Sequence, residues 1–423
     1  MPAVPNEVKG GQIVPPQATP FAKKARRSRI PAGQTQMGCI GAQADRGVFC
    51  SATGPKTFRR IADARAPGSQ FMKSRILGRT GLSVAEIGLG TEYLLNTSQE
   101  NLSTVLHTAV EAGVNYVDFF YAQPEIRDWM GNALQGIRSQ VTLAAHFGAA
   151  ETDGQYRKTN DMAESQAYFE DLLRRLRTDH VDVLFLHNVD KEEDVDLALG
   201  PFLDQVRRYR DQGLARYIGF SGHTAAGAIR AVESGAVDIL MYPVHIGEHG
   251  DADRDAVLAA CCAHDVGIVA MKVFAGGKLI RERAADGFTA VHGLSYALSR
   301  HGVATAVPGP ANLQELREDL AFITSSPEER DFGGQLAAME PGDGEPTCVY
   351  CNHCLPCPED INIGAVSRIL DAWEAGHTTW ATREYARLAV PPSACSACGQ
   401  CAERCPWGVD SPDRMRRTAE ALG

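Results

Sequence analysis

The stretch HVDVLFLH, residues 180–187, is the most informative pattern in the chain. Its apolar and β-branched residues run together without alternation, which is typical of a strand buried on both faces of a parallel sheet. The stretch ends on a polar residue, His187. Seven further runs have the same character, and together with the first they predict eight buried strands: residues 84–90, 115–120, 140–146, 216–221, 236–243, 266–273 and 303–308.

A longer amphipathic segment follows each of these runs and predicts a helix. Clear examples are residues 98–112, 162–177, 200–212 and 312–322. Eight βα units in about 260 residues predict an α/β fold, a (β/α)8 TIM barrel. An open doubly wound sheet would alternate in the same way, but no Gly-x-Gly-x-x-Gly turn follows the first strand.

Polar side chains occupy the carboxyl ends of six predicted strands. They are Asp118, His146, His187, Ser221, Tyr242 and Lys272. In such barrels these strand ends meet on one face, where the active site is built. Asp118, His146 and His187 end neighbouring strands, so we expect their side chains to converge. The alternative is that these residues only cap the loops that begin there.

Seven stretches between residues 74 and 322 resemble the aldo-keto reductase family. They are LSVAEIGLGT at 82–91, GVNYVD at 113–118, VDVLFLH at 181–187, IGFS at 218–221, GIVAMK at 267–272, GG at 276–277 and VPG at 307–309. The resemblance implies a barrel that reduces small-molecule carbonyls with a nicotinamide cofactor, NAD(P). It also implies a catalytic set in which Tyr protonates the carbonyl oxygen, Lys paired with Asp lowers the Tyr pKa, and His orients the carbonyl. Asp118 and His187 occupy two of the four matching positions.

The sequence departs from the family at the other two positions. Gln123 stands where the Tyr is expected, and His146 stands where the Lys is expected. Tyr121 is the candidate replacement for the phenol. Lys272 is the candidate replacement for the cation, although packing against a nicotinamide or a structural role is an open alternative.

The residues expected to bind the cofactor follow the family only in part. Ser221 matches the position that binds the nicotinamide amide, but Gly222 follows where Asn is usual and Met241 stands where Gln is common. Gly309 opens a loop and helix that could hold a phosphate at the helix N-terminus. Glu315 stands where a basic residue often grips a 2′-phosphate, so the sequence does not favour NADP over NAD.

Eight of the twelve cysteines lie in two runs near the C-terminus. The second run, Cys395-x2-Cys398-x2-Cys401-x3-Cys405-Pro406, has the spacing of bacterial ferredoxins. The first run, Cys348-x2-Cys351-x2-Cys354-x2-Cys357-Pro358, is one residue shorter before its last cysteine. The spacing predicts two [4Fe–4S] clusters. Two structural zinc ions, which also take four thiolates each, are the competing interpretation.

The two runs are expected to share their clusters, because in two-cluster ferredoxins the fourth Cys of each run ligates the other cluster. One expected ligand set is Cys348, Cys351, Cys354 and Cys405, and the other is Cys357, Cys395, Cys398 and Cys401. A helix is expected between the runs, at residues 365–375. His353, beside Cys354, is expected to be a surface residue, because every cluster position already has a thiolate.

The remaining features define the expected domains and setting. Residues 1–71 lack regular periodicity and predict a disordered or loosely structured extension. Residues 72–335 are expected to form the barrel, and residues 336–423 a small C-terminal ferredoxin-like iron–sulfur domain, a combination that resembles a subgroup of the family. The net charge of −10 argues against a nucleic-acid partner, and no apolar run is long enough to span a membrane. Clustered thiols without a secretion signal favour the cytoplasm.

Three functional hypotheses follow. The leading one is an iron–sulfur oxidoreductase acting on a small carbonyl or hydroxyl substrate, whose clusters relay electrons to or from a redox partner protein. The second uses Asp118 and histidines at the barrel top for a metal site, or for acid–base elimination or isomerisation without nicotinamide. These histidines are His146, His187, His223, His245 and His249. Of them, His223 and His249 are expected to have ordinary loop or surface roles. The third hypothesis is a non-catalytic electron carrier.

Overall fold

A computed structural model describes residues 71–95, 97–339, 348 and 350–423. The expected N-terminal extension, apart from Phe71, lies outside the described residues, as do Cys39 and Cys50. Within the described part of the chain, no helix is both long enough and apolar enough to cross a membrane.

Eight parallel strands form the central sheet, in the order β12-β11-β10-β9-β8-β5-β4-β3. The strands are β3 (Leu89–Gly90), β4 (Tyr116–Asp118), β5 (Thr142–Phe147), β8 (Val181–Leu186), β9 (Ala215–Ser221), β10 (Ile239–Pro243), β11 (Gly267–Met271) and β12 (Val303–Ala306). The sheet curls until its edges meet: the Gly88 amide donates to the Ala306 carbonyl at 2.8 Å, and the Ala306 amide donates to the Glu86 carbonyl at 2.9 Å. The expected α/β barrel is confirmed.

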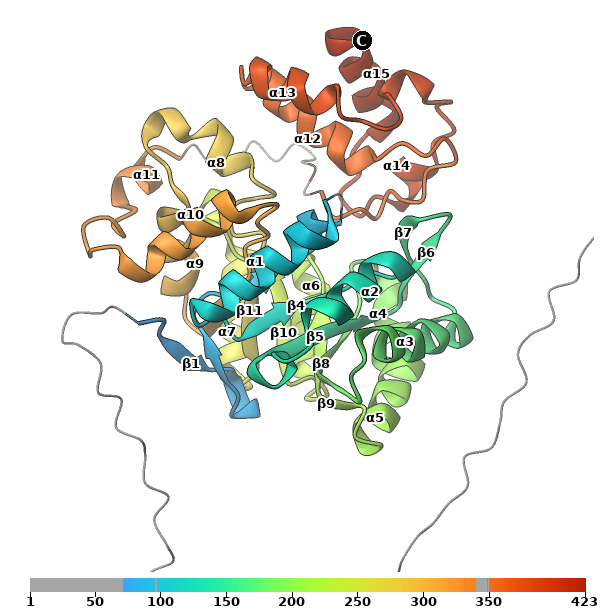
Figure 1. Ribbon diagram of the computed structural model, residues 1–423, viewed down its shortest axis with the longest axis vertical. Coiled ribbons are helices and arrows are strands. Elements are labelled where there is room, and N and C mark those ends of the chain that lie inside the picture. The colour runs from blue at the N-terminus through green and yellow to red at the C-terminus, as the bar shows by residue number, and fades with distance from the viewer. Residues whose placement is uncertain (1–70, 96, 340–347, 349) are drawn as a thin grey trace, which may run out of the picture. The chain divides into compact units, whose positions relative to one another are not determined.

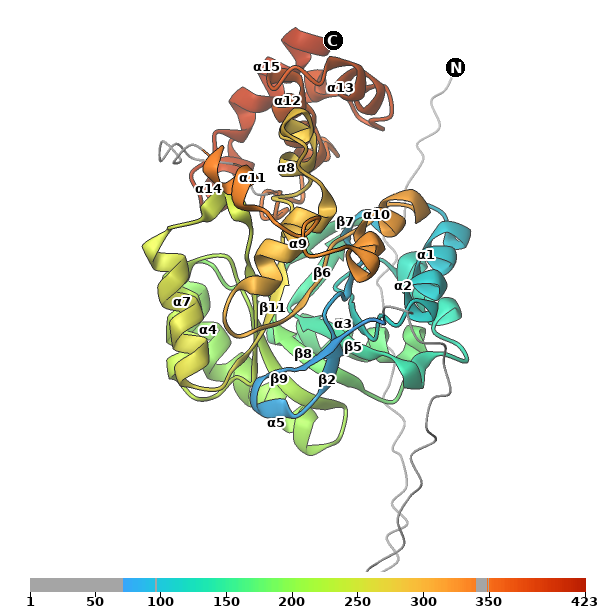
Figure 2. The same cartoon turned by 90° about the vertical axis from the view of Figure 1, so that its left-hand side faces the viewer.

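Helices follow the strands along the chain and cover the outside of the barrel, as α1, α2, α3 and α5 do in Figure 1. The helices of this part of the chain are α1 (Gln99–Glu111), α2 (Pro124–Ala133), α3 (Met162–Leu176), α4 (Glu192–Leu197), α5 (Leu203–Asp211), α6 (Ala225–Glu233), α7 (Ala252–Ala263), α8 (Lys278–Glu282), α9 (Ala290–Ser299), α10 (Leu313–Thr324) and α11 (Gly333–Ala337). Among them, α8 lies above the barrel rather than around it (Figure 2). Alternate strand residues such as Val183 and Phe185 pack in a separate apolar cluster inside the barrel. The intervening residues, such as Leu184 and Leu186, face the helices, so the strands are buried on both sides, as their continuous apolar sequences predict.

Three local features differ from the sequence expectations. The predicted strand at residues 84–90 is divided: β2 (Ser83–Ala85) pairs with β1 (Ser74–Ile76) in a separate hairpin, and only β3 joins the barrel. The helix predicted from residue 200 begins as α5 at Leu203, because Gly200 precedes a proline and has non-helical backbone angles. A second hairpin, β6 (Ala149–Thr152) with β7 (Gln155–Lys158), follows β5 and was not predicted.

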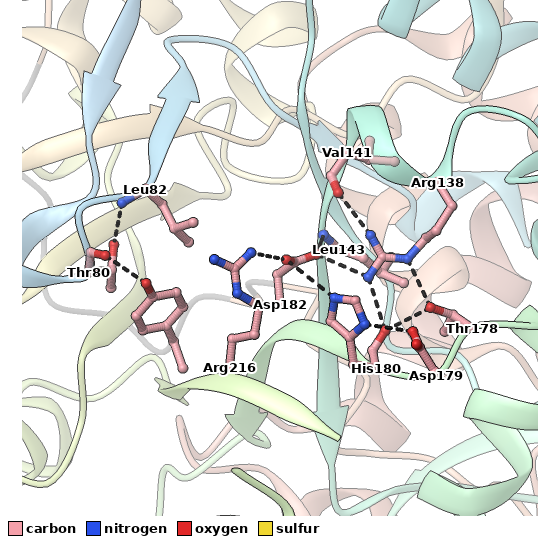
Figure 3. A network of polar contacts seen from close by, with 11 residues as sticks. Thr80, Leu82, Arg138, Val141, Leu143, Thr178, Asp179, His180, Asp182 and Arg216 are labelled. Atoms are coloured by element: carbon pink, nitrogen blue, oxygen red, sulfur yellow. Dashed lines mark hydrogen bonds and ion pairs between the residues drawn. The ribbon is translucent and has the colours of Figure 1, made fainter. Parts of the chain in front are cut away.

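Asp182 anchors the amino-terminal end of the barrel, opposite the carboxyl ends of the strands. Its carboxylate accepts hydrogen bonds from the Leu143 amide at 2.9 Å, Arg138 at 3.1 Å and Arg216 at 2.8 Å (Figure 3). These donors come from β5, from the turn before it and from β9, so one buried carboxylate joins three neighbouring strands. Polar residues at this end of a barrel usually serve stability rather than catalysis.

The C-terminal region, described at residue 348 and residues 350–423, contains helices and no strand among its described residues. The helices are α12 (Ile363–Glu374), α13 (Thr378–Tyr385), α14 (Gln400–Arg404) and α15 (Ser411–Leu422). The helix expected at residues 365–375 is α12, which begins after the N-cap Asn362. It packs against both α13 and α15, and Figure 2 shows the three grouped together. The two cysteine runs lie on either side of α12 and α13 in the chain.

Candidate active site

A cavity of about 620 Å³ lies at the carboxyl ends of the barrel strands. Its size is typical of a small-molecule site. Five of the six polar strand-end residues line it: Asp118, His146, His187, Ser221 and Lys272. The sixth, Tyr242, is outside the lining and lies under the Arg254 guanidinium, 5.0 Å from the ring centroid. The strand ends therefore converge as expected, except for Tyr242.

Asp118, His146 and His187 form a continuous hydrogen-bonded chain that ends on Tyr156. Asp118 Oδ1 lies 2.9 Å from His146 Nε2, and His146 Nδ1 lies 2.8 Å from His187 Nδ1. His187 Nε2 lies 2.6 Å from the Tyr156 hydroxyl, which also accepts a hydrogen bond from Asn188 Nδ2 at 2.8 Å. All four members of the chain from Asp118 to Tyr156 are buried. Both nitrogens of each imidazole are therefore engaged.

The direction of these hydrogen bonds follows from counting donors and acceptors. The Asp118 carboxylate only accepts, so His146 donates from Nε2 and, when neutral, accepts at Nδ1. His187 then donates from Nδ1 and accepts the Tyr156 hydroxyl proton at Nε2. Burial, and then the neighbouring His146, hold the pKa of His187 well below its ordinary value. Burial also raises the pKa of Tyr156 well above its ordinary value. Neutral His187 and protonated Tyr156 are the states that this chain of donors requires.

Tyr156 was missed by the sequence analysis, which proposed Tyr121 as the phenol. The Tyr121 hydroxyl instead donates to the backbone carbonyl of Glu92, and Tyr121 does not line the cavity. Gln123, at the family's Tyr position, donates from Nε2 to the Gly154 carbonyl at 3.0 Å and so holds the turn of the β6–β7 hairpin. That hairpin carries Tyr156. The Asp153-Gly154 pair, typical of a tight hairpin turn, was the available signal for it.

Lys272 lines the cavity but does not join the histidine chain. Its Nζ forms an ion pair with Glu92 at 2.8 Å. Burial alone would lower the pKa of Lys272, but the Glu92 carboxylate outweighs burial and holds that pKa above its ordinary value. The Lys272 side chain is therefore a fixed positive charge in the cavity wall. Its backbone is in the left-handed region, with a φ of 55°.

The predicted cofactor residues Ser221 and Gly309 both line the cavity, and so does Met241. Helix α10 starts after the N-cap Asn312, whose side chain accepts a hydrogen bond from the Glu315 amide. The Glu315 carboxylate in turn accepts from the Ala311 amide at 2.8 Å. An acidic side chain therefore occupies the helix start where a 2′-phosphate would need a cation.

The eight clustered cysteines are free and surround two small cavities in the C-terminal region. One cavity is lined by Cys348, Cys351, Cys354 and Cys405. The other is lined by Cys357, Cys395, Cys398 and Cys401, with Cys354 at its edge. The fourth cysteine of each run thus faces the cavity of the other run. Burial raises the pKa of the Cys348 thiol to about 11, so these cavities suit a group that balances thiolate charge.

No group of three or more His, Cys, Asp or Glu side chains in the described residues could hold a single metal ion. This applies to the barrel top, so the hypothesis of a barrel metal site gains no support. It also applies to the cysteine runs, whose sulfurs are spread around cavities rather than gathered at one point.

His353 is not the surface residue that the sequence analysis expected. Its side chain is only 8% exposed, and its Nε2 lies 3.1 Å from a carboxylate oxygen of Asp190, which is fully buried. His223 shares the same carboxylate through Nδ1 at 3.0 Å, so it too has a buried role rather than a surface one. His249, by contrast, is exposed, and its Nδ1 lies 3.2 Å from the Tyr296 hydroxyl. Asp190 lies in the loop after β8 and contacts the cysteine region through His353. The sequence alone could not predict this contact.

The cysteine region and the barrel share the wall of the large cavity. Cys351, from the first run, lines that cavity together with the barrel residues His187, Asn188 and His223. The β6–β7 hairpin also contacts the first run: Gln155 accepts a hydrogen bond from the Cys357 amide at 3.0 Å. A group bound by Cys351 would therefore border the cavity that holds the histidine chain.

Comparison with known proteins identifies the barrel. Residues 86–290 match the profile of the aldo/keto reductase family. This part of the chain is similar to the aldo/keto reductase family. An oxidoreductase of Bacillus subtilis, YqkF, named as uncharacterized, is 24% identical over 286 residues, which are 59% of this chain and 90% of the relative. A D-threo-aldose 1-dehydrogenase of a Pseudomonas species is 26% identical over 226 residues, covering 47% of this chain and 68% of the relative.

The fold of the barrel also resembles solved structures. The holo form of an aldo-keto reductase from Bacillus halodurans has a TM-score of 0.54 and 22% identity, and the match covers 64% of this chain and 98% of the solved one. Taken together, the family match and the relatives make this protein an oxidoreductase enzyme. The family match ends at residue 290 and does not reach the cysteine runs.

Proposed function

We propose that the protein interconverts a carbonyl and a hydroxyl group on a small substrate in the barrel cavity, and that two [4Fe–4S] clusters in the C-terminal region carry the electrons. The division into a barrel of residues 72–335 and a cluster region of residues 336–423, and a place in the reducing cytoplasm, are parts of the proposal. The observation that carries it is the buried chain from Asp118 to Tyr156, beneath a cavity whose wall includes Cys351.

The donor geometry supports clusters over zinc. A zinc ion needs four sulfurs at about 2.3 Å from one point. The eight cysteines instead surround two cavities in the crossed arrangement that their spacing predicts. When bound, two such clusters supply one-electron exchange, two electrons in total, which is the number that carbonyl–hydroxyl interconversion transfers.

The histidine chain supplies the protons of the reaction. His146 lies between Asp118 and His187, so the Asp118 carboxylate would stabilise a proton taken up by His187 through the His146 ring. Tyr156 is a positioning residue in this scheme, because its hydroxyl fixes His187 Nε2 and it does not line the cavity. Ser221 and Gly309 would hold a nicotinamide cofactor, which supplies hydride exchange when it is present.

A second candidate function, elimination or isomerisation without a net redox change, is favoured by the same proton chain. The two functions differ in whether the electrons of the clusters move during turnover. The test is to add a panel of aldehydes to anaerobically purified, chemically reduced full-length protein and follow cluster absorbance and the EPR signal. Reoxidation of the clusters by an aldehyde supports the proposal, whereas turnover that leaves the clusters reduced supports the second candidate.

Two variants complete this experiment. His187→Ala is expected to abolish aldehyde-driven reoxidation, because it breaks the proton chain. His249→Ala removes an exposed histidine whose ring bonds to the Tyr296 hydroxyl, outside the proton chain, and is expected to leave the reoxidation unchanged. Equal loss in both variants would contradict a specific role for the chain.

A further inference from the structure

Two arginines and a tyrosine in the cavity wall have no role in the proposed chemistry and no carboxylate partner among the described residues, unlike Arg383 and Arg387, which pair with Glu384. Tyr93 lies in a short helical turn after β3 (Glu92–Leu94), Arg281 lies in α8, and Arg368 lies in α12 of the C-terminal region. All three line the large cavity. The barrel and the C-terminal region therefore contribute hydrogen-bond donors to the same part of the wall.

Several of these donors are buried without an acceptor. The Tyr93 hydroxyl and the Nε and Nη2 atoms of Arg281 are inaccessible to solvent, and none has a hydrogen-bond partner among the described residues. A buried donor without a partner is costly, and the cost is larger for a charged group. A guanidinium can only donate, so the missing group must be an acceptor.

The two guanidinium groups also contact the same indole ring. Arg281 lies 4.8 Å from the ring centroid of Trp380, and Arg368 lies 5.6 Å from the same centroid. Arg368 further contacts the Tyr93 ring at 4.8 Å. Burial lowers the pKa of Arg281, and the charge of Arg368 lowers it as well. Each guanidinium gains from its contact with the indole, but the two like charges repel each other, and an anion beside them would offset that repulsion.

The acidic residues of the cavity wall do not supply that anion. Glu92 pairs with Lys272, and Glu384 bonds to Arg383 and Arg387. Glu315 accepts a hydrogen bond from the Ala311 amide just before α10, and Glu318 accepts one from Gln314 on α10. Burial raises the pKa of Asp319 well above its ordinary value, which disfavours its charged form. Within the described residues, neither Arg281 nor Arg368 forms an ion pair with a carboxylate.

We propose that Tyr93, Arg281 and Arg368 form a subsite for the carboxylate or phosphate group of a ligand in the cavity. A planar guanidinium matches the paired oxygens of either anion, and the phenol adds a third donor. The ligand would be a carbonyl or hydroxyl substrate that carries an anionic group, and this choice of ligand rests on the proposed function. It also assigns the C-terminal region a part in substrate binding, through Arg368, in addition to its cysteines.

The test is a titration of the full-length, anaerobically purified protein with inorganic phosphate, pyrophosphate and succinate. Tryptophan fluorescence reports binding, because both guanidinium groups contact Trp380. Arg281→Gln, Arg368→Gln and Tyr93→Phe are the test variants. Each arginine variant is expected to bind the anions about tenfold more weakly, the loss of one charge-assisted hydrogen bond. Arg368→Lys keeps the charge and is expected to bind better than Arg368→Gln.

Arg417→Gln is the matched control. Arg417 lies on α15, outside the cavity lining, and pairs with Glu374, so its replacement is expected to leave anion affinity unchanged. If Arg281→Gln and Arg368→Gln bind all three anions as well as Arg417→Gln does, the subsite is refuted. This result needs no turnover, so it is distinct from failure of the proposed function.

Two further measurements identify the source of the anion. For a substrate anion, the ratio of kcat/KM for succinic semialdehyde to that for butanal falls about tenfold in Arg368→Gln, because only the first aldehyde carries a carboxylate. If NADH affinity falls while that ratio is unchanged, the subsite stands but its anion is the cofactor pyrophosphate, and the assignment to substrate is overturned.

Discussion

The barrel and the C-terminal region carry their chemistry in different ways. In the C-terminal region the reactive residues are eight cysteines whose spacing alone predicts which four belong together, and the two cavities are lined accordingly. In the barrel, the reactive chain joins Asp118, His146, His187 and Tyr156 across 69 positions of sequence, three at strand ends and one in an inserted hairpin. Local spacing thus specifies the first site, whereas only the fold assembles the second.

The largest expected effect tests the crossed pairing of the cysteines. Cys351→Ala and Cys405→Ala come from different runs but line the same cavity, so each is expected to abolish the same cluster. The two single variants and their double variant should each retain about four iron ions per chain and show the same EPR signal. Cys262→Ser, outside both runs, is expected to lose no iron.

If Cys405→Ala removes the cluster of its own run instead, the pairing is not crossed. In that case the spacing of the cysteines would not predict which four of them bind one cluster. The C-terminal region would then not differ from the barrel in this respect.

The next largest effect concerns the barrel. His187→Ala is expected to lower kcat by about 10²- to 10⁴-fold, the usual contribution of a positioned acid–base group. Tyr156→Phe should cost less and should shift the pH profile of kcat/KM, because it removes the hydroxyl that fixes His187 Nε2. A Tyr156→Phe enzyme with an unchanged pH profile would show that the hairpin phenol is only structural.

Asp190 links the two regions, so its removal tests whether they form one folded unit. Asp190→Ala leaves two buried histidines without their shared carboxylate and is expected to reduce the free energy of unfolding by about 3 kcal/mol. Urea denaturation measures the change. Asp196→Ala, which removes an exposed ion pair with Arg230, should change stability by less than about 0.5 kcal/mol. Similar values for the two variants would contradict the link.

The smallest effect is a dependence of stability on pH. The pKa of His187 is depressed in the folded protein, so as the pH falls the unfolded chain binds a proton at this residue before the folded chain does. Below about pH 6.5 this site alone lowers the unfolding free energy by up to about 1.4 kcal/mol per pH unit. His187→Asn should reduce the slope of stability against pH between about pH 5 and 6.5. An unchanged slope would mean that the buried ring is protonated in the folded state.

Much of the fold follows from the sequence, because buried parallel strands such as β8 require continuous apolar runs. Asp118, His146 and His187 were predictable for the same reason, since each ends a strand. Tyr156 was not, because its position depends on a hairpin held by Gln123. Nor was the buried Asp190–His353 pair, which joins residues 163 positions apart. Contacts of this kind depend on how helices, strands and loops that are distant in the sequence pack together. The local pattern of apolar and polar residues does not predict that packing.

Iron and acid-labile sulfide analysis of the anaerobically purified chain tests the central claim most directly. Two clusters in the two cysteine-lined cavities predict about eight iron ions and about eight sulfides per chain. About four of each would leave one cavity without a cluster. Stoichiometric zinc without sulfide would contradict the account, because the C-terminal region would then carry no electrons to the barrel.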